Sequence, residues 1–550
     1  MTSFWKSVAL FAVTLSLMAG AFAQGDRIRT IELLTRPQAA APQEFQSAQL
    51  IAQAWRDLGL DVEVEAMPWE QLADRVWYDR DAWDATAWQM VGRPERGDPD
   101  EIVFNLFHSS TAESGYNFIG YDNPEYDALA EAQRVETDPE ARQRLVAEAQ
   151  EVLDADQPYM FLVHPQVAYA FRSDVWEADT IVEQNGIGIK NFWSFTGAEP
   201  TGDQRDMILN SADVVQAINP LYISGAVDSW ITELIWDRLL RVGPDGLPQP
   251  WAAESYTWVD ETTIDVTLRS DMTWHDGEPV TVEDVVFSFE APMGGEVPMY
   301  EPFVSGIETV EALDDATVRF ELKQPSAAFL VTSLAKVNLV PKHVWEPILA
   351  DLADDPDNAE SYQEEMPIGS GPFEFVRWRP SEEVVLAANA EHFGAPAYDR
   401  WILRIVPNSE AAVGMLRRGE LNFLSAYAGD PQVLVDTAAN EPIEVVASTD
   451  IGFRFIGFNH RRPPFDDAAF RKALSQVVNR NLIAQAAYRG FAVPSNSPVS
   501  PALPFWHNDA VMDLETGADV SRAILEDAGY TVDGSGALRY PEGVTETLDD

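Results

Sequence analysis

The chain has 550 residues, 46% of them apolar, which is enough for large hydrophobic cores in roughly two to four domains. Asp and Glu number 90 against 37 Lys and Arg, so the formal net charge is −53. Such a surface repels phosphate backbones and argues against nucleic acid as a partner. It is typical of a solvated, soluble protein, although attraction of a basic ligand stays open. The sequence has no Cys, which excludes disulfides and a lipid anchor on a Cys thiol.

Residues 1–23 have the pattern of a cleavable secretory signal. Lys6 provides the positive start, Val8–Ala19 is an apolar run too short to span a bilayer, and Ala21-Phe22-Ala23 is a small-x-small cleavage site. No other stretch is apolar enough to cross a membrane. The pattern therefore predicts a mature protein in an extracytoplasmic space, most simply a periplasm, with no lipid anchor.

The first elements of the mature chain predict a β-α-β unit. A strand is expected over 28–35, a helix over about 43–58 with Ala48, Ile51 and Trp55 on one face, and a strand over 61–66. Parallel strands with a right-handed crossover follow from this order.

Further along, strands are expected over 85–89 and 159–171. Two helices are expected after the caps Asn123 and Asp138, because each cap is followed by a Pro that suits the first helical position. Residues 196–203 are rich in Gly, Pro and polar side chains and are interpreted as a linker.

The second half begins with a strand expected over 207–211. Tyr256 and Trp258 alternate with polar residues, as do the apolar residues of 264–268, so two half-buried strands are expected with Asp260-Glu261 between them. The cluster Trp274–Pro279 predicts a turn, and Thr281 with Asp284 predicts a capping box at the start of a helix.

No motif of the sequence indicates catalysis. His275-Asp276 could belong to a hydrolase triad, but no Gly-x-Ser-x-Gly elbow occurs, so the pair is interpreted as part of the turn. The seven His residues are scattered singly, and no zinc motif on one helix is present. The sequence therefore predicts no enzyme, no cofactor and no metal site.

The region from Pro250 to Glu290 resembles the signature of the family 5 extracellular solute-binding proteins, the dipeptide, oligopeptide and nickel binders of ABC importers. The residues that carry the resemblance are Ala253-Glu254-Ser255, Arg269, Trp274-His275-Asp276-Gly277, Pro279 and Glu283-Asp284-Val285-Val286-Phe287-Ser288. The nickel binders of the family imply that a single His could still ligate a chelated metal.

The order of the matching segments is unusual. The residues before about 165, such as Asn123-Pro124-Glu125-Tyr126-Asp127, resemble the last third of the family, whereas residue 206 resembles its N-terminus. A circular permutation fits best. A truncated tandem fusion and a gene-model artefact are the alternatives. A permutation predicts that Asp550 lies near Arg27 and that 28–35 and 529–540 share one lobe.

The resemblance implies an α/β fold of two lobes with a hinge between them, the class II periplasmic-binding-protein fold of the large peptide-binder type. The expected division is a signal over 1–23, a first part of lobe II over 24–165, lobe I over 166–455, and a second part of lobe II over 456–550. The connections near residues 165 and 455 would be the hinge strands, and the solute would lie between the lobes.

The resemblance also suggests residues of the solute site. Trp88, followed by Gln89, aligns with the cleft Trp of the peptide binders, but the acidic anchor for a peptide amine is missing from its usual place. Arg93 and Arg96 in the next loop could meet a carboxylate or a phosphate. Further candidates, on the lobe I wall or near the hinges, are Tyr222, Asn459 and His164.

The function implied is capture of a peptide, an amino acid conjugate or an oligosaccharide by a monomeric protein that delivers it to the membrane subunits of an ABC permease. The alternative is a ligand-sensing binder that serves a chemoreceptor or has a chaperone-like role.

Overall fold

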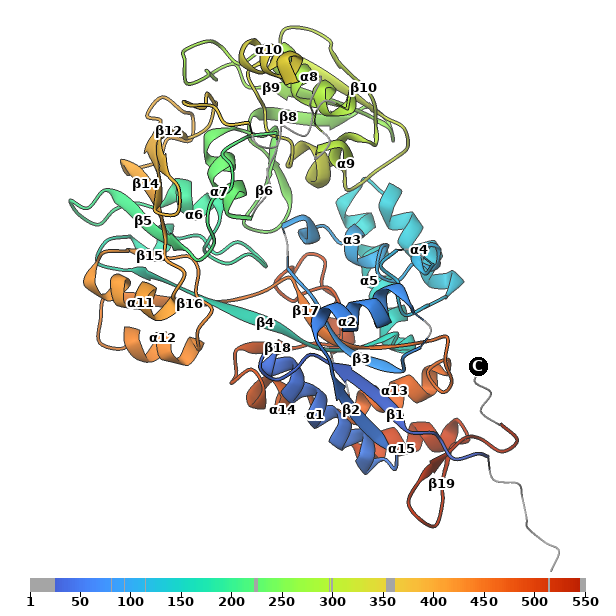
Figure 1. The fold of residues 1–550 in the computed structure, drawn as a ribbon. Helices are drawn as coiled ribbons and strands as arrows, with labels where there is room; N and C mark the ends of the chain where they lie inside the picture. Colours follow the sequence, from blue (N-terminus) through green and yellow to red (C-terminus); the bar gives the residue numbers. More distant parts are fainter. Residues whose placement is uncertain are drawn as a thin grey trace, which may run out of the picture.

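The computed structural model describes residues 25–544 except 81, 93, 114, 222–225, 296, 298, 299, 353–361, 513 and 514. Its buried apolar side chains gather in two bodies (Figure 1). In one body, here called lobe I, the core residues run from Ala168 to Ile443. In the other, lobe II, they run from Ile28 to Val163 and again from Ile451 to Tyr540. The expected two-lobed α/β fold is confirmed.

Lobe II begins with the predicted β-α-β unit. Strand β1 (Ile31–Thr35) pairs in parallel with β2 (Val62–Ala66), and helix α1 (Pro42–Asp57) connects them. The α1 face that carries Ala48, Ile51 and Trp55 is fully buried, as its apolar spacing predicts. The other strand beside β1 is β3 (Ala85–Met90), also parallel.

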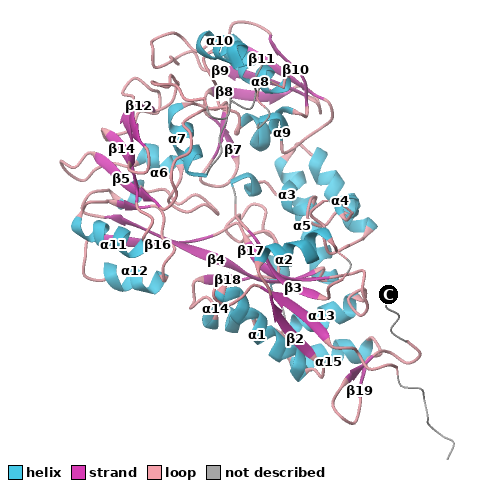
Figure 2. Ribbon diagram, in the orientation of Figure 1, coloured by secondary structure: helices cyan, strands magenta, loops and turns pink. Residues whose placement is uncertain are grey.

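Helices cover the lobe II sheet (Figure 2). The predicted caps are confirmed: the Asn123 and Asp138 side chains accept hydrogen bonds from the first turns of α4 and α5, and each helix starts with Pro. The helices of this lobe are α1, α2 (Trp69–Ala73), α3 (Asp100–Val103), α4 (Pro124–Val135), α5 (Pro139–Asp156), α13 (Ala468–Gln476), α14 (Arg480–Ala486) and α15 (Ala518–Asp527).

The two ends of the chain meet in lobe II, where blue and red ribbons lie together in Figure 1. The Ile28 amide donates to the Leu538 carbonyl at 3.2 Å, and the Tyr540 amide donates to the Asp26 carbonyl at 3.0 Å. The small hairpin of β19 (Thr531–Val532) and β20 (Leu538–Arg539) makes this contact. Residues 28–35 and 529–540 thus share one lobe. Asp550 lies outside the described residues.

Lobe I is built around β5 (Asp206–Ser211), which pairs in parallel with β14 (Arg400–Ile405) and β15 (Phe423–Leu424). Strands β12 (Phe373–Arg379) and β13 (Glu383–Ala388) extend this sheet in antiparallel fashion beyond β14. The helices of this part are α6 (Phe192–Gly197), α7 (Ala226–Ile235), α11 (Ser409–Arg418) and α12 (Pro431–Ala438), and a small ribbon pairs β6 (Leu240–Val242) with β7 (Pro248–Pro250).

A second sheet lies at the far end of lobe I, in the order β10-β11-β9-β8. The predicted hairpin is confirmed as β8 (Ala253–Trp258) and β9 (Thr263–Leu268), and the predicted capping box of Thr281 and Asp284 starts α8 (Val282–Met293). The other elements are β10 (Ile307–Ala312), β11 (Thr317–Leu322), α9 (Glu301–Val304) and α10 (Lys342–Leu352).

One long strand crosses between the lobes. In β4 (Tyr159–Arg172), residues from Gln166 onward pair with β16 (Ile443–Thr449) of lobe I, whereas Tyr159 to Val163 pair with β17 (Phe453–Phe458) of lobe II. Strand β18 (Ala492–Pro494) also pairs with β4 near this crossing. The chain returns between β16 and β17, so the lobes are joined by two adjacent connections (Figure 1).

The linker interpretation of 196–203 is correct only in part, because residues 199 and 201–203 are exposed and irregular, but the segment connects α6 to β5 within lobe I. Helix α6 occupies Phe192–Gly197, and Phe195 and Ala198 are fully buried in the lobe I core. Farther on, the Thr201 amide donates to the Val175 carbonyl at 2.9 Å. Only the start of the segment is packed, because the apolar residues before it are buried in the lobe I core.

Candidate functional site

The carboxyl ends of parallel strands from both lobes lie near the connections. Gly92 follows β3, and a side chain at this position would collide with the Asp450 carboxylate, which lies between β16 and β17. Asp213 follows β5 in lobe I. Since ligands of open α/β sheets bind outside the carboxyl ends of the strands, this junction is the candidate site.

Trp88 lies near the carboxyl end of β3, but its ring is almost fully covered. Only 6% of the residue is exposed, and Trp69 packs on it with ring centroids 4.7 Å apart. Phe118 lies 5.6 Å from it on another side. Trp69, at the start of α2, is itself 46% exposed and has Arg36 above its ring at 5.7 Å. Of these three rings, that of Trp69 is therefore the one exposed to solvent.

The side chain of Gln89 is partly buried, and Gln89 pairs with Arg454 in the β3–β17 register. Arg96 is buried and forms an ion pair with Glu101, its Nε 2.9 Å from Oε1, so its charge is already used within lobe II. Arg93 and Tyr222 lie outside the described residues.

Asn459 and His164 have no exposed surface. The Asn459 amide nitrogen donates to the carbonyls of Arg80 and Trp83 at 2.8 and 3.0 Å. His164 lies on β4, with Nδ1 3.0 Å from the Gly452 carbonyl and Nε2 3.2 Å from the Ser497 carbonyl. Burial lowers the pKa of His164 to about 4, so the ring is neutral at pH 7. Both side chains hold backbone segments together in this conformation.

The sequence analysis did not single out Trp69, Lys190, Trp230, Asp213 or Asp450. Trp69 could have been noticed, because Pro68-Trp69 directly follows the end of β2. Lys190 and Trp230 carry no local signal, since they come from different segments of lobe I and meet only in the fold.

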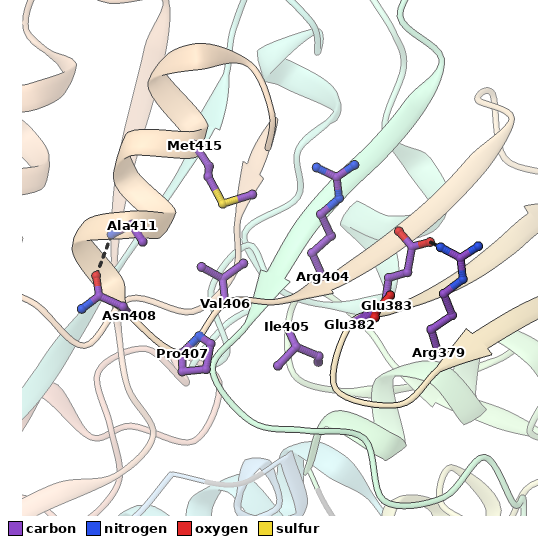
Figure 3. A pocket seen from close by; sticks show the side chains of 10 residues that line it. All are labelled: Arg379, Glu382, Glu383, Arg404, Ile405, Val406, Pro407, Asn408, Ala411 and Met415. Carbon is purple, nitrogen blue, oxygen red and sulfur yellow. Dashed lines mark hydrogen bonds and ion pairs between the residues drawn. The ribbon is translucent and has the colours of Figure 1, made fainter.

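Two cavities each lie within a single lobe. One of about 550 Å³ lies beside the carboxyl end of β14, where Arg379 and Arg404 come near α11 (Figure 3). Its charges are already engaged: Arg379 lies 3.7 Å from Glu383, and Arg404 donates to the Glu420 carbonyl at 2.9 Å. A second cavity, of about 590 Å³, lies between α4 and α5 and has Glu125, Glu148 and Glu151 in its lining.

The turn interpretation of His275-Asp276 is confirmed. The Gly369 amide donates to Nδ1 of His275 at 3.2 Å, Nε2 lies 3.1 Å from the Gly371 carbonyl, and Gly277 takes the positive φ of 92° that the turn requires. Within the described ranges, no cluster of His, Asp and Glu could hold a metal ion. Among the helices described, none is long and apolar enough to cross a membrane.

Comparisons with known proteins agree with the motifs. The family model described as bacterial extracellular solute-binding proteins, family 5 middle, matches residues 248–549. The oligopeptide-binding protein AppA of Bacillus subtilis is 27% identical over 344 residues, which are 60% of this chain and 61% of that protein. The glutathione-binding protein GsiB of Salmonella typhi is 24% identical over 363 residues, which are 64% of this chain and 65% of that protein.

A crystal structure of a nickel ABC transporter from Bacillus halodurans is 22% identical, with a TM-score of 0.49 over 62% of this chain and 67% of that one. The chain spans less than two thirds of the length of AppA and of GsiB. The family model, in contrast, matches more than half of the 550 residues and includes the signature region around Trp274. The chain therefore belongs to the family 5 extracellular solute-binding proteins of bacteria.

Proposed function

We propose that this protein is an extracytoplasmic solute-binding protein that captures a peptide-like solute between its lobes and delivers it to an ABC import permease. Membership of the family carries the proposal, since its model spans 248–549 and its description names binding proteins. The relatives AppA and GsiB, an oligopeptide-binding and a glutathione-binding protein, support a peptide-like solute.

The division of the chain supports closure around a solute. We place the boundaries near residue 165 and between residues 443 and 451, because the lobe cores separate between Val163 and Ala168 and between Ile443 and Ile451, and Phe455 already belongs to the lobe II core. Two adjacent connections allow the lobes to rotate about a hinge. In the described conformation the lobes touch at the far edge, where the Ala327 amide donates to the Arg134 carbonyl at 2.7 Å.

We also propose that the chain is a circular permutation of the family order. The contacts of Ile28 with Leu538 and of Tyr540 with Asp26 support it. So does the coverage of AppA, since a collinear alignment can follow only one of two exchanged blocks. Mass spectrometry of the native protein is expected to find a peptide that crosses from Arg205 to Asp206, such as the chymotryptic peptide 196–209. Two separate polypeptides ending and starting there would refute the order.

Residues 1–23 are proposed as the signal that directs the protein to the periplasm. They lie outside the described residues. Release of the signal after Ala23 leaves Gln24 as the first residue, and N-terminal sequencing of the native protein is expected to read Gln24-Gly25-Asp26.

The binding function is tested with a defined peptide mixture. The purified protein is incubated with a tryptic digest of serum albumin, separated from unbound peptides by gel filtration, and denatured to release what it carries. We expect mass spectrometry to find a reproducible subset of the peptides and the melting temperature to rise, because a ligand that binds only the folded state stabilises it. Retention of no peptide above the level of a heat-denatured control would overturn the proposal.

A further inference from the structure

Lys190 is a cation held at the junction of the lobes. It follows the loop 184–189, in which Ile187 packs against a lobe II core and Gly186 closely approaches Ile451 of the β16–β17 connection. The loop is fixed from within lobe I, because the Tyr169 hydroxyl donates to the Ile187 carbonyl at 3.0 Å and the Asn191 amide donates to the Val182 carbonyl at 2.7 Å. Lys190 is thus positioned by rigid neighbours.

Lys190 forms no direct ion pair within the described residues. It makes no side-chain hydrogen bond within the described part of the chain either, and its only close charged or aromatic contact there is the Trp230 ring of α7, 4.2 Å from Nζ to the centroid. A cation over an indole face is attracted by the ring quadrupole, but the ring supplies no hydrogen-bond acceptor. The three N–H groups therefore remain available to an acceptor from outside the protein.

Two acidic side chains influence Lys190 without pairing with it. Both Asp213, after β5, and Asp450, between β16 and β17, act on its charge through space. Asp450 is held in place, since the Gly452 amide donates to its Oδ1 at 3.1 Å and the carboxylate lies against Gly92 of lobe II. One carboxylate of lobe I and one of the β16–β17 connection therefore act on the ammonium.

We propose that Lys190, resting on Trp230, is the subsite that receives a carboxylate of the bound solute. A carboxylate supplies hydrogen-bond acceptors for the ammonium, and such a charge-assisted bond is stronger than one between neutral groups. The nearby Asp213 and Asp450 disfavour a doubly charged group such as phosphate by repulsion, so a single negative charge fits best. This inference rests on the proposed binding of a peptide-like solute.

The acid–base properties of Lys190 agree with this role. Burial lowers the pKa of the ammonium to about 8, and the two carboxylates only partly oppose the shift. Lys190 is half-buried, so its charge is partly removed from water, and an incoming carboxylate offsets that cost. Solutes that carry a carboxylate are therefore expected to bind more tightly than neutral solutes.

The test compares two forms of one probe. A tryptic digest of serum albumin is used as such and after its carboxyl groups have been converted to amides, and retention by the protein is quantified. We expect the amidated digest to be retained about tenfold less or weaker still, as loss of a charge-assisted bond predicts. Equal retention of both digests would overturn the carboxylate subsite while leaving the binding function intact. Retention of neither would refute the binding function, and the subsite with it.

Substitution of Lys190 tests whether this residue causes the preference for free carboxyl groups. Lys190→Met is expected to retain about tenfold less of the untreated digest and to lose the preference over the amidated one, while melting at or above the wild-type temperature without solute. The matched control Lys342→Met, at an exposed lysine of α10, is expected to behave as wild type. If Lys190→Met keeps the full preference for free carboxyl groups, the assignment is wrong. Should it fail to fold, Lys190→Gln gives the same reading.

One retained peptide then identifies which carboxylate binds. It is synthesised with a C-terminal amide and, separately, with Asn and Gln in place of Asp and Glu. Loss of affinity for the first form assigns the chain terminus, and loss for the second assigns a side chain. Unchanged affinity for both forms would contradict the proposal.

Discussion

Single residues at the junction serve the fold in two different ways. The Asn459 amide donates to two backbone carbonyls, and both ring nitrogens of His164 lie near backbone carbonyls, one of which the neutral ring can donate to. Lys190, in contrast, is half-buried and forms no ion pair or side-chain hydrogen bond among the described residues. His164 and Asn459 therefore stabilise the region of the connections, whereas Lys190 is the side chain proposed to bind the solute.

His164 makes stability depend on pH. Its pKa in the folded protein is about 4, below the value of 6.5 for an exposed His, so the unfolded chain binds more protons between these values. Stability contributed by the neutral ring is complete above pH 6.5 and is lost as the pH falls toward 4. The loss amounts to about 3 kcal/mol.

The measurement is urea unfolding of wild type and His164→Asn at pH 7 and pH 4.5. Wild type is expected to lose more stability between the two pH values than the variant, which cannot be protonated there. The same change in both proteins would show that His164 does not titrate as described.

Single elements follow from local sequence signals with few exceptions. Periodicity predicts α1 and β4 to within two residues, and the caps Asn123, Asp138 and Thr281 mark true helix starts. Local patterns fail where tertiary packing decides, as at 196–198, where the polar sequence hides the end of helix α6 and the buried Ala198.

The capping box of α8 is a quantitative test at this scale. The Thr281 hydroxyl accepts from the Asp284 amide at 3.3 Å, and the Asp284 carboxylate accepts from the Thr281 amide at 2.9 Å. Thr281→Ala is expected to destabilise lobe I by about 1 kcal/mol, and Thr281→Ser by much less, because Ser keeps the hydroxyl. Urea midpoints measure both. An Ala variant as stable as the Ser variant would mean that the cap contributes nothing.

At the scale of the whole molecule, the motifs predict the architecture better than the site. Two lobes and a crossing near residue 165 follow from ordered family motifs and one long apolar strand. The exposed Trp69 and the covered Trp88 cannot be distinguished in sequence, because which indole covers the other depends on how α2 folds over β3. Likewise Lys190, Trp230 and Asp450 come from distant segments of the chain, and they come near one another only in the folded protein.

Binding of one solute between two lobes is the central claim, and calorimetric titration tests it most directly. A synthetic peptide, chosen from those that the protein retains, is titrated into the protein at pH 7. We predict saturable binding of one peptide per chain, with a negative heat-capacity change, since closure removes apolar surface from water. Absence of saturable heat for every retained peptide would contradict the claim, as would a stoichiometry well above one.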